Sequence, residues 1–388
     1  MMDSKPVVES NDAEERSRII AHYEVNGSTA AEARAKADLI CLDQTIEAGE
    51  EILTTTLRAK IIGRVEAIHS RSSNRFEVRV TFSADLLVPD CASLLGLLFG
   101  MSSFRPGVRL LSFDLPTQLL SQWSGSRFGL RGLRDATGVH HRAFVCAVLK
   151  PLGLSPSELA DLALQFTLGG VDLIKDDQSL IDQPFCPFEE RVARCSEAVA
   201  KGTALTGRPC FYMPHVSGPL DRMRQRAQLA KKAGAAGLLI APGLTGFDAL
   251  RALAEDKALG LPIASHPSFL GSYAMHQDGG LAPAVLYGQL PRLAGADVSI
   301  YPSYDSGYAM TKDECVAVAE ACRSPWDRVR PTVPSAAGRI GIAQVAELGA
   351  TYGRDVMFIL GSRIQQDRDD LTMATERFVR EVERATGG

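Results

Sequence analysis

The sequence from about residue 141 onward alternates short apolar segments with longer amphipathic ones. Eight of the short segments are rich in Val, Ile, Leu and Phe, and each is followed by a stretch long enough to form a helix. Strands that are apolar throughout are buried on both faces, which is typical of parallel sheets covered by helices. Eight such units predict a closed (β/α)8 barrel, a TIM barrel of the α/β class, over residues 141–388. The expected strands are 144–149, 171–174, 210–213, 237–240, 262–266, 297–301, 331–333 and 356–359.

An open, doubly wound sheet is the alternative arrangement for alternating strands and helices. Such sheets commonly bind nucleotides through G-x-G-x-x-G or G-x-x-x-x-G-K-[ST] loops. The sequence contains neither motif. The barrel is therefore the favoured fold.

The first part of the chain, residues 18–140, predicts a small α+β domain of ferredoxin-like character, preceded by a flexible segment at 1–17. Alternating apolar and polar residues predict strands, whereas a longer apolar periodicity predicts helices. A short polar turn at 70–74 joins two strand candidates, so we expect an antiparallel sheet. The expected strands are 18–25, 60–69, 75–82 and 110–115, and the expected helices are 30–45 and 91–99.

Composition places the chain among folded globular proteins, with 45% hydrophobic and 23% charged residues. Lys and Arg total 42 against 46 Asp and Glu, without a dense basic run, so a nucleic-acid partner is disfavoured. No apolar segment reaches the roughly 20 residues that cross a bilayer, and the polar start of the chain does not resemble a signal peptide. The eight cysteines include no Cys-x-x-Cys pair. We expect a cytoplasmic protein with reduced cysteines in its core and no membrane partner.

Polar residues follow most of the expected barrel strands. Catalytic residues of barrel enzymes lie at the C-terminal ends of the strands, and a barrel shaped for stability alone would not need polar residues there. We therefore place the candidate active site at this end. The residues are Lys150, Lys175, Asp176, Asp177, Gln178, His215, His266, Tyr301, Tyr304, Ser335, Gly361 and Ser362.

The segment Lys175-Asp176-Asp177-Gln178 brings two carboxylates and an amine together after an apolar strand. Strand alternation puts Lys175 and Asp177 on the same side of the sheet. Oxygen-rich groups of this kind suit a hard cation such as Mg²⁺. The alternative is a solvated acidic loop with an ion pair, because exposed ion pairs are common and contribute little stability.

The other strand-end residues also have two interpretations each. Lys150, if partly removed from water, would have a lowered pKa and could transfer protons, or it could simply reach solvent. His266 is a candidate acid or base, although single histidines often form structural hydrogen bonds. Gly361 and Ser362 could bind phosphate through backbone N–H groups or form a plain turn. His215 could line the same site or begin a turn before the next helix.

Taken together, these motifs resemble the large subunit of ribulose bisphosphate carboxylase (RuBisCO) and, more closely, the RuBisCO-like (form IV) proteins. The resemblance covers nearly the whole chain, including the order of a small α+β domain and a barrel. It implies that Lys175 reacts with CO2 to give a carbamate that binds Mg²⁺, with Asp177 and residue 178 as further ligands. It also implies that Lys150 lies beside the reacting carbons and that His266 belongs to the catalytic site. The segments that carry it are Lys150-Pro151-Leu152-Gly153-Leu154-Ser155, Gly169-Gly170-Val171-Asp172-Leu173-Ile174-Lys175-Asp176-Asp177 and Gln183-Pro184-Phe185.

Several positions depart from the pattern of the true carboxylases. Gln178 stands where the family has a glutamate ligand, and it offers a carbonyl oxygen without a charge, so metal affinity should fall. Pro267 replaces an arginine that contacts phosphate, and the loop at 301–307 lacks a Gly-Lys pair. In the N-terminal domain Leu97 replaces an asparagine, and Asp43 stands for a glutamate. These losses argue strongly against carboxylation of ribulose bisphosphate.

What the resemblance retains is enolisation, in which a cation polarises a carbonyl while a base removes the neighbouring proton. The expected substrate is a phosphorylated keto sugar or sugar acid. The favoured activity is that of a 3-oxo-isoapionate-4-phosphate transcarboxylase/hydrolase or decarboxylase. The alternatives are a 2,3-diketo-5-methylthiopentyl-1-phosphate enolase and a 5-methylthioribulose-1-phosphate isomerase. The residues expected to bind the substrate are His215, Ser335, Gly361, Ser362 and Asp43.

A function of another class stands beside these activities. Gln178 and Leu97 are also compatible with a catalytically inactive scaffold or a small-ligand binding protein that kept the barrel and lost the metal. The resemblance further implies a homodimer, in which Asp43 of one subunit completes a composite active site with the barrel of the other.

Overall fold

A computed structural model describes residues 17–47, 49–276, 278–304, 306–360, 364 and 370–387. The chain divides into two compact units. One comprises Met1–Trp123 and His276–Val285, and the other comprises Ser124–Met275 and Leu286–Gly388. Within the described ranges, no helix combines the length and the apolar character needed to cross a membrane. The segment expected to be flexible, 1–17, lies outside the described residues except for Ser17.

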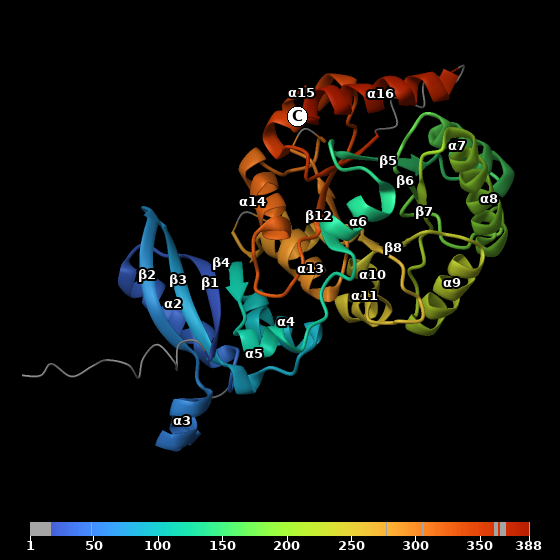
Figure 1. Cartoon of the computed structure of the whole chain (residues 1–388). Coiled ribbons are helices and arrows are strands. Elements are labelled where there is room, and N and C mark those ends of the chain that lie inside the picture. The colour runs from blue at the N-terminus through green and yellow to red at the C-terminus, as the bar shows by residue number, and fades with distance from the viewer. Residues whose placement is uncertain are drawn as a thin grey trace, which may run out of the picture. The chain divides into compact units, whose positions relative to one another are not determined.

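The second unit contains the eight-stranded parallel barrel that the sequence predicts (Figure 1). Its strands are neighbours in the order β7-β6-β5-β13-β12-β11-β9-β8. A parallel bridge between His215 and Leu239 joins the end of β7 to β8 and closes the ring. The strands are β5 (Phe144–Leu149), β6 (Leu173–Asp176), β7 (Phe211–Met213), β8 (Leu238–Ile240), β9 (Ile263–Ser265), β11 (Val298–Pro302), β12 (Val333–Ala337) and β13 (Met357–Ile359).

Two strands, β6 and β12, extend two or more residues further toward the C-terminal end of the barrel than the apolar pattern predicts. In β6, Lys175 pairs with Val148 on one side and with Met213 on the other. In β12, Ser335 pairs with Ile300 and Met357. Ladder hydrogen bonds use the backbone, so a polar side chain does not end a strand whose neighbours on both sides continue. Lys175 and Ser335 therefore lie within strands and not in the loops after them.

The barrel interior is a packed hydrophobic core. Every barrel strand contributes at least one side chain, and Phe144, Leu239, Val298 and Val333 are fully buried there. A filled interior of this kind is typical of eight-stranded barrels. The core holds the strands rigidly and leaves only their C-terminal ends and the loops beyond them to form a site.

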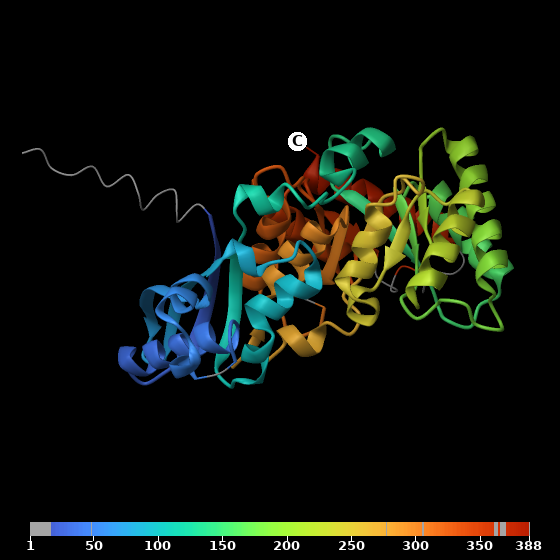
Figure 2. The same ribbon diagram turned by 90° about the horizontal axis from the view of Figure 1, so that it is seen from below.

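Helices surround the strands. Figure 1 shows α7, α8, α9, α14, α15 and α16 arranged around the barrel, and Figure 2 shows the green to yellow helices among them outside the strands. The helices of this unit are α6 (Gly129–Thr137), α7 (Pro156–Leu168), α8 (Phe188–Thr206), α9 (Leu220–Lys232), α10 (Pro242–Thr245), α11 (Phe247–Ala254), α12 (Gly271–Ala274), α13 (Leu290–Ala294), α14 (Lys312–Arg323), α15 (Ile342–Tyr352) and α16 (Leu371–Thr386). The π-helix η4 (Ala284–Gln289) begins with the last two residues of the first unit and leads into α13.

The compact units do not divide at residue 140, where the sequence pattern places the domain boundary. Residues 124–140 belong to the barrel unit. The physical reason is helix α6, whose Leu133 is fully buried in the barrel core. The chain therefore enters the barrel unit one helix before its first strand.

The first unit contains a five-stranded sheet in the order β10-β4-β1-β3-β2, and the pairings among β1, β2, β3 and β4 are antiparallel, as expected. Strand β10 comes from the chain between β9 and β11 and pairs in parallel with β4. Helix α2 packs against the sheet and buries Ala33, Ala37 and Ile40 (Figure 1). The elements are β1 (Arg18–Asn26), α2 (Ala30–Asp43), η1 (Glu50–Ile52), α3 (Thr55–Ile61), β2 (Arg64–Ser72), β3 (Arg75–Ser83), η2 (Ala84–Leu86), α4 (Cys91–Phe99), η3 (Met101–Phe104), β4 (Val108–Asp114), α5 (Thr117–Leu120) and β10 (Gly280–Leu281).

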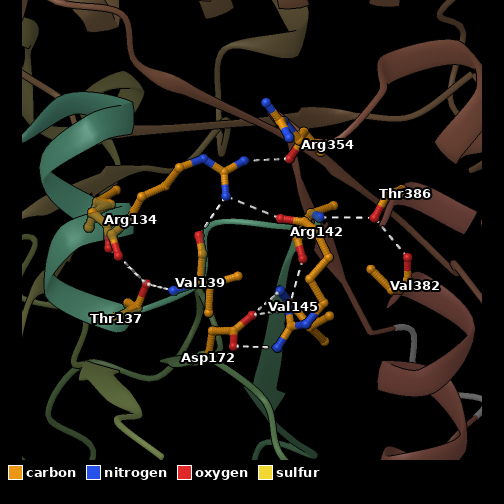
Figure 3. Close-up of polar contacts among 11 residues, drawn as sticks. Arg134, Thr137, Val139, Arg142, Val145, Asp172, Arg354, Val382 and Thr386 are labelled. Carbon is orange, nitrogen blue, oxygen red and sulfur yellow. Dashed lines mark hydrogen bonds and ion pairs between the residues drawn. The ribbon is translucent and has the colours of Figure 1, made fainter. Parts of the chain in front are cut away.

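The N-terminal end of the barrel is tied together by a polar network (Figure 3). Arg142 donates two hydrogen bonds, of 2.7 and 2.8 Å, to the two carboxylate oxygens of Asp172. Asp172 also accepts the backbone N–H of Val145 at 2.8 Å. Arg134 donates to the carbonyl oxygens of Val139, Arg142 and Arg354 and to the carboxylate of Asp355. Bidentate and charge-assisted bonds of this kind fix the starts of several elements at once.

All eight cysteines are buried free thiols, as expected from the absence of paired spacings.

Candidate functional site

A cavity of about 480 Å³ lies within the barrel unit, at the C-terminal ends of the strands. Its apolar walls include Val148, Ile300 and Ile359, which belong to the barrel core, and Met275 and Leu360. Its polar lining includes three cationic side chains, and among the described lining residues there is no Asp or Glu. The polar side chains are Lys150, Lys175, Gln178, His266, Ser268, Tyr287, Tyr308 and Arg339. The cavity therefore suits an anion with an apolar portion.

Lys175 is the most deeply placed of the three cations. It projects from β6 and is 3% exposed, and its amine donates one hydrogen bond, of 3.1 Å, to the backbone oxygen of Asp176. Burial lowers the pKa of this amine from 10.5 to about 8, because the charged form loses its hydration. Near neutral pH most Lys175 amines are therefore still charged, and a minor part of the population is neutral and nucleophilic.

The two aspartates that follow Lys175 have different environments. Asp176 is fully buried and faces away from the cavity. It accepts hydrogen bonds from the Tyr212 hydroxyl at 2.7 Å, from Arg191 Nε at 3.2 Å and from the backbone N–H of His215 at 3.0 Å. Asp176 therefore fixes the ends of β6 and β7, and only one carboxylate of the pair is left for the site.

Asp177 is that carboxylate. Its Oδ2 lies 3.6 Å from the amine of Lys150, which follows β5, while its Oδ1 accepts the backbone N–H of Ser179 at 2.9 Å. Lys150 is 37% exposed and lines the same cavity. Gln178 also lines the cavity. The alternation that the sequence predicts is thus present, with Lys175 and Asp177 on one side and Asp176 on the other.

The two predicted histidines differ in their access to the cavity. His266 lines the cavity, and its Nδ1 accepts the backbone N–H of Ser268 at 3.2 Å. Burial and the nearby Lys175 amine hold the His266 pKa well below 6.5, so the ring is neutral and carries its proton on Nε2.

His215 is fully buried and is not among the described residues that line the cavity. Its Nε2 shares a 2.8 Å hydrogen bond with the hydroxyl of Ser217, and its Nδ1 has no partner among the described residues. Burial lowers the His215 pKa to about 3, with the Lys175 charge as the next cause. His215 therefore lies behind the cavity wall as a neutral ring.

The remaining predicted substrate-binding residues are not among the described residues that line the cavity. Ser335 is fully buried in β12, and its hydroxyl has no hydrogen-bond partner among the described residues. Asp43 lies in the N-terminal unit and pairs there with Arg105. Gly361 and Ser362 lie outside the described residues. The roles expected for these four residues stay predictions.

Four polar residues of the cavity, Ser268, Tyr287, Tyr308 and Arg339, are not among those that the sequence predicts, and the structure explains two of them. Tyr287 is 1% exposed and comes from π-helix η4, inside a stretch that resembles an ordinary helix between strands. Arg339 follows β12 in a turn with positive φ angles at Gly338 and Arg339. A Cβ at Gly338 would lie 2.4 Å from the Cβ of Ser306, so only glycine permits this close approach of two loops. Neither signal can be read from residue type alone.

The donors in the cavity, together with Asp177 beside Lys150, fit a hard cation on one condition. No cluster of three or more His, Cys, Asp or Glu side chains that could hold a metal ion is found among the described residues. If the neutral amine of Lys175 reacts with CO2, the resulting carbamate, the Asp177 carboxylate and the Gln178 amide provide oxygen ligands of the type that Mg²⁺ prefers. Such a set carries one negative charge less than two carboxylates and a carbamate.

Comparison with known proteins identifies close relatives. The family description "Ribulose bisphosphate carboxylase large chain, catalytic domain" matches residues 129–365. Ribulose bisphosphate carboxylase-like protein 1 of Rhodopseudomonas palustris is 38% identical over 94% of this chain and 97% of its own length. The 5-methylthioribulose-1-phosphate isomerase of Rhodospirillum rubrum is 36% identical over 94% of this chain and 96% of its own length. The 2,3-diketo-5-methylthiopentyl-1-phosphate enolase of Geobacillus kaustophilus is 32% identical over 79% of this chain and 74% of its own length.

Solved structures agree with this relationship. The RuBisCO-like protein from Rhodopseudomonas palustris superimposes with a TM-score of 0.86 at 36% identity, covering 94% of this chain and 97% of that one. The dimeric RuBisCO from Hyperthermus butylicus superimposes with the same TM-score at 21% identity, over 95% of this chain and 91% of that one. At that identity the second likeness shows the fold alone.

Proposed function

This chain belongs to the ribulose bisphosphate carboxylase large-chain family as a RuBisCO-like protein, and we propose that it catalyses proton transfer beside the carbonyl of a small phosphorylated keto sugar. The observation that carries the proposal is the cavity in which Lys150, Lys175, His266 and Arg339 meet an apolar wall. Cations attract the phosphate, and the apolar wall accommodates a hydrophobic substituent at the other end of the sugar.

The activities named for the relatives favour isomerisation or enolisation. Two of them are an isomerase and an enolase, and both act on five-carbon phosphates with a methylthio group, as their names state. The isomerase is the more similar of the two and matches nearly the full length of this chain. We therefore place isomerisation of a 5-methylthioribulose-1-phosphate type of substrate first and enolisation second. Decarboxylation of a 3-oxo sugar-acid phosphate, the activity that the sequence favours, is the alternative, and the experiment below distinguishes it from the other two.

In this proposal carbamylated Lys175, Asp177 and Gln178 would hold Mg²⁺. The chemistry supplied by bound Mg²⁺ is Lewis acidity, which makes a C–H group beside a carbonyl easier to deprotonate. Asp177 also keeps Lys150 near the site, since their charged atoms lie 3.6 Å apart. Asp176 fixes the end of β7 and the start of the next loop by accepting hydrogen bonds from the Tyr212 hydroxyl and the His215 backbone N–H.

The protein groups then divide the proton chemistry between them. Lys150, a half-buried amine at the cavity wall, carries the proton between neighbouring substrate carbons. Neutral His266 donates its Nε2 hydrogen to a substrate oxygen, where negative charge develops as the proton leaves. The apolar wall excludes water from the reacting carbons, which strengthens both interactions.

The test is proton exchange in deuterated water. The full-length protein, with Mg²⁺ and bicarbonate, is incubated with 5-methylthioribulose 1-phosphate, 2,3-diketo-5-methylthiopentyl 1-phosphate or a 3-oxo sugar-acid phosphate. Deuterium entering the carbon beside the carbonyl of either methylthio substrate supports the proposal. Release of CO2 from the 3-oxo acid alone would replace it with the decarboxylase alternative, and no turnover of any substrate would favour the scaffold.

Two lysine variants serve as the matched pair for this test. Lys150→Met should abolish exchange, because the proton carrier is removed. Lys201→Met removes an exposed lysine on α8 and should leave exchange unchanged. Equal rates in the two variants would contradict the role of Lys150.

We propose, from the resemblance, a homodimer in which Asp43 completes the site of the other subunit. Sedimentation of the protein as a stable, active monomer would exclude this part of the proposal.

A further inference from the structure

Ser268 is a cavity residue whose hydroxyl and backbone N–H both bind the ring of His266. The hydroxyl oxygen lies 2.9 Å from His266 Nδ1, and the backbone N–H donates to the same nitrogen at 3.2 Å. A backbone N–H can only donate, so Nδ1 carries no hydrogen and is the acceptor in both bonds. The Ser268 hydroxyl is therefore the donor in the shorter bond, and its single hydrogen is used there.

The backbone that carries this pair is anchored on both sides. The His266 N–H donates to the carbonyl oxygen of Ile240 in β8 at 2.7 Å. Pro267 has a fixed φ angle and disfavours a helical conformation of His266 before it. A Cβ at Gly243 in α10 would lie 2.4 Å from the Ser268 carbonyl oxygen, so only glycine permits this close approach. The two hydrogen bonds to Nδ1 therefore come from a loop whose own position is fixed.

The other ring nitrogen of His266 is available to a ligand. Nε2 has no hydrogen-bond partner among the described residues. The side chain is partly exposed and lines the cavity, and Nε2 is not one of the buried unpaired polar atoms found among the described residues. Nδ1 of His215 is the contrasting case, because it is unpaired and also buried. The neutral His266 ring thus carries its hydrogen on an accessible nitrogen.

A hydrogen bond at one ring nitrogen changes the donor strength of the other. When an oxygen that accepts the Nε2 hydrogen gains negative charge, electron density moves through the ring and makes Nδ1 a stronger acceptor. The bond from the Ser268 hydroxyl to Nδ1 therefore strengthens as charge builds on the substrate oxygen. Interactions that are stronger in the transition state than in the ground state accelerate the chemical step.

We propose that Ser268 is a positioning residue for His266, whose hydroxyl restrains the ring through Nδ1 and strengthens Nε2–H as the donor to the substrate oxygen during proton transfer. This inference rests on the proposed function and adds to it a residue that acts through His266. The hydroxyl hydrogen is used at Nδ1, so Ser268 does not donate to the substrate itself. Its loss should therefore lower kcat and leave KM nearly unchanged.

The first experiment is NMR of the free, full-length protein with isotopically labelled histidine ring nitrogens. The His266 resonances are assigned by their absence in His266→Gln. In the wild type, Nδ1 should give the resonance of an unprotonated, hydrogen-bonded nitrogen, and Nε2 that of a protonated one. Ser268→Ala keeps the backbone N–H, so the tautomer should persist while the Nδ1 resonance moves toward that of a nitrogen with fewer hydrogen bonds. An unchanged Nδ1 resonance would overturn the inference, because the hydroxyl would then not bind the ring.

The second experiment measures proton exchange with Mg²⁺ and bicarbonate on the substrate that the wild type turns over. Ser268→Ala should lower kcat roughly fivefold, the effect of one lost neutral hydrogen bond. KM should stay within about twofold of the wild-type value, since the lost bond is made to His266 and not to the substrate. A raised KM with an unchanged kcat would overturn the inference, because Ser268 would then bind the substrate directly.

Ser272→Ala is the matched control. Ser272 is an exposed serine of α12, and its hydroxyl donates to the carbonyl oxygen of Phe269 at 3.4 Å. The change removes the same group from the same loop and should alter neither the His266 resonances nor kcat. A comparable loss of kcat in both variants would assign the effect to the loop as a whole and would overturn the role of the Ser268 hydroxyl.

The wild-type protein separates this inference from the proposed function. If it exchanges protons with none of the three substrates, the proposed function fails and the inference falls with it. An active wild type with an unaffected Ser268→Ala variant removes only the inference.

Discussion

The two ends of the barrel differ in whether certain buried polar groups have hydrogen-bond partners. At the N-terminal end Arg142 and Asp172 satisfy each other, and Asp297 accepts three backbone N–H groups. At the C-terminal end the Tyr287 and Ser335 hydroxyls are buried without partners among the described residues. Fully satisfied polar groups stabilise a fold, whereas unsatisfied ones are tolerated where a ligand will use them. The difference separates the end that holds the barrel together from the end at which we propose the chemistry.

The largest expected effect is at the C-terminal end. Lys175→Met should lower the rate of proton exchange by roughly 10³-fold or more, because it removes the amine that anchors the metal site. The same change should raise the free energy of unfolding at pH 7 by about 1 kcal/mol, since a poorly paired buried amine is replaced by an apolar side chain of similar size. Exchange assays and urea unfolding measure the two effects. A large loss of stability would make Lys175 a structural residue.

The next effect is at the other end, with the signs reversed. Asp172→Ala leaves the partly buried guanidinium of Arg142 without its carboxylate and the Val145 N–H without its acceptor. We expect the free energy of unfolding to fall by about 3 kcal/mol, while the activity of the molecules that remain folded changes by less than about twofold. Urea unfolding measures the change in the free energy of unfolding. The value of kcat at saturating substrate, expressed per folded molecule, measures the change in activity. A strong loss of kcat in folded protein would contradict the division between the two ends.

A smaller effect should come from restoring the missing charge in the site. Gln178→Glu gives the proposed metal site a second carboxylate beside that of Asp177. This change should tighten Mg²⁺ binding roughly tenfold, or by about 1.4 kcal/mol. Titration with Mg²⁺ in bicarbonate buffer measures the change. Gln225→Glu, at an exposed position on α9, adds the same charge and should leave the affinity unchanged. Equal affinities of the two variants would place the metal elsewhere.

The smallest effect concerns the pH dependence of stability. Burial raises the pKa of Asp297 from 3.8 to about 6, so between these values the folded state binds more protons than the unfolded chain. The free energy of unfolding contributed by Asp297 therefore falls as pH rises through this range. The stability difference between the wild type and Asp297→Asn should shrink by an amount on the order of 1 kcal/mol between pH 5 and pH 7. A difference that is constant with pH would show that the three N–H donors keep the carboxylate ionised throughout.

The site could be predicted in part because its chemistry is local in the sequence. Lys175 lies in β6 and Asp177 directly follows the end of this strand, so continued alternation predicts that both side chains lie on one side. Lys150 and His266 follow strands whose C-terminal ends meet at one edge of a parallel barrel, which made their meeting predictable. Tyr287 could not be found in this way, because its approach depends on a π-helix and on anchors at Ser299 and Cys322.

The sequence by itself determined the barrel, the antiparallel character of the N-terminal sheet and the end at which the site lies, because hydrophobic periodicity and strand direction act over a few neighbouring residues. Tertiary structure alone decided that Asp176 serves the framework while Asp177 faces Lys150. It also decided that Leu133 of α6 joins the barrel core. Burial and hydrogen-bond satisfaction depend on which distant segments of the chain come into contact, and local sequence patterns do not predict those contacts.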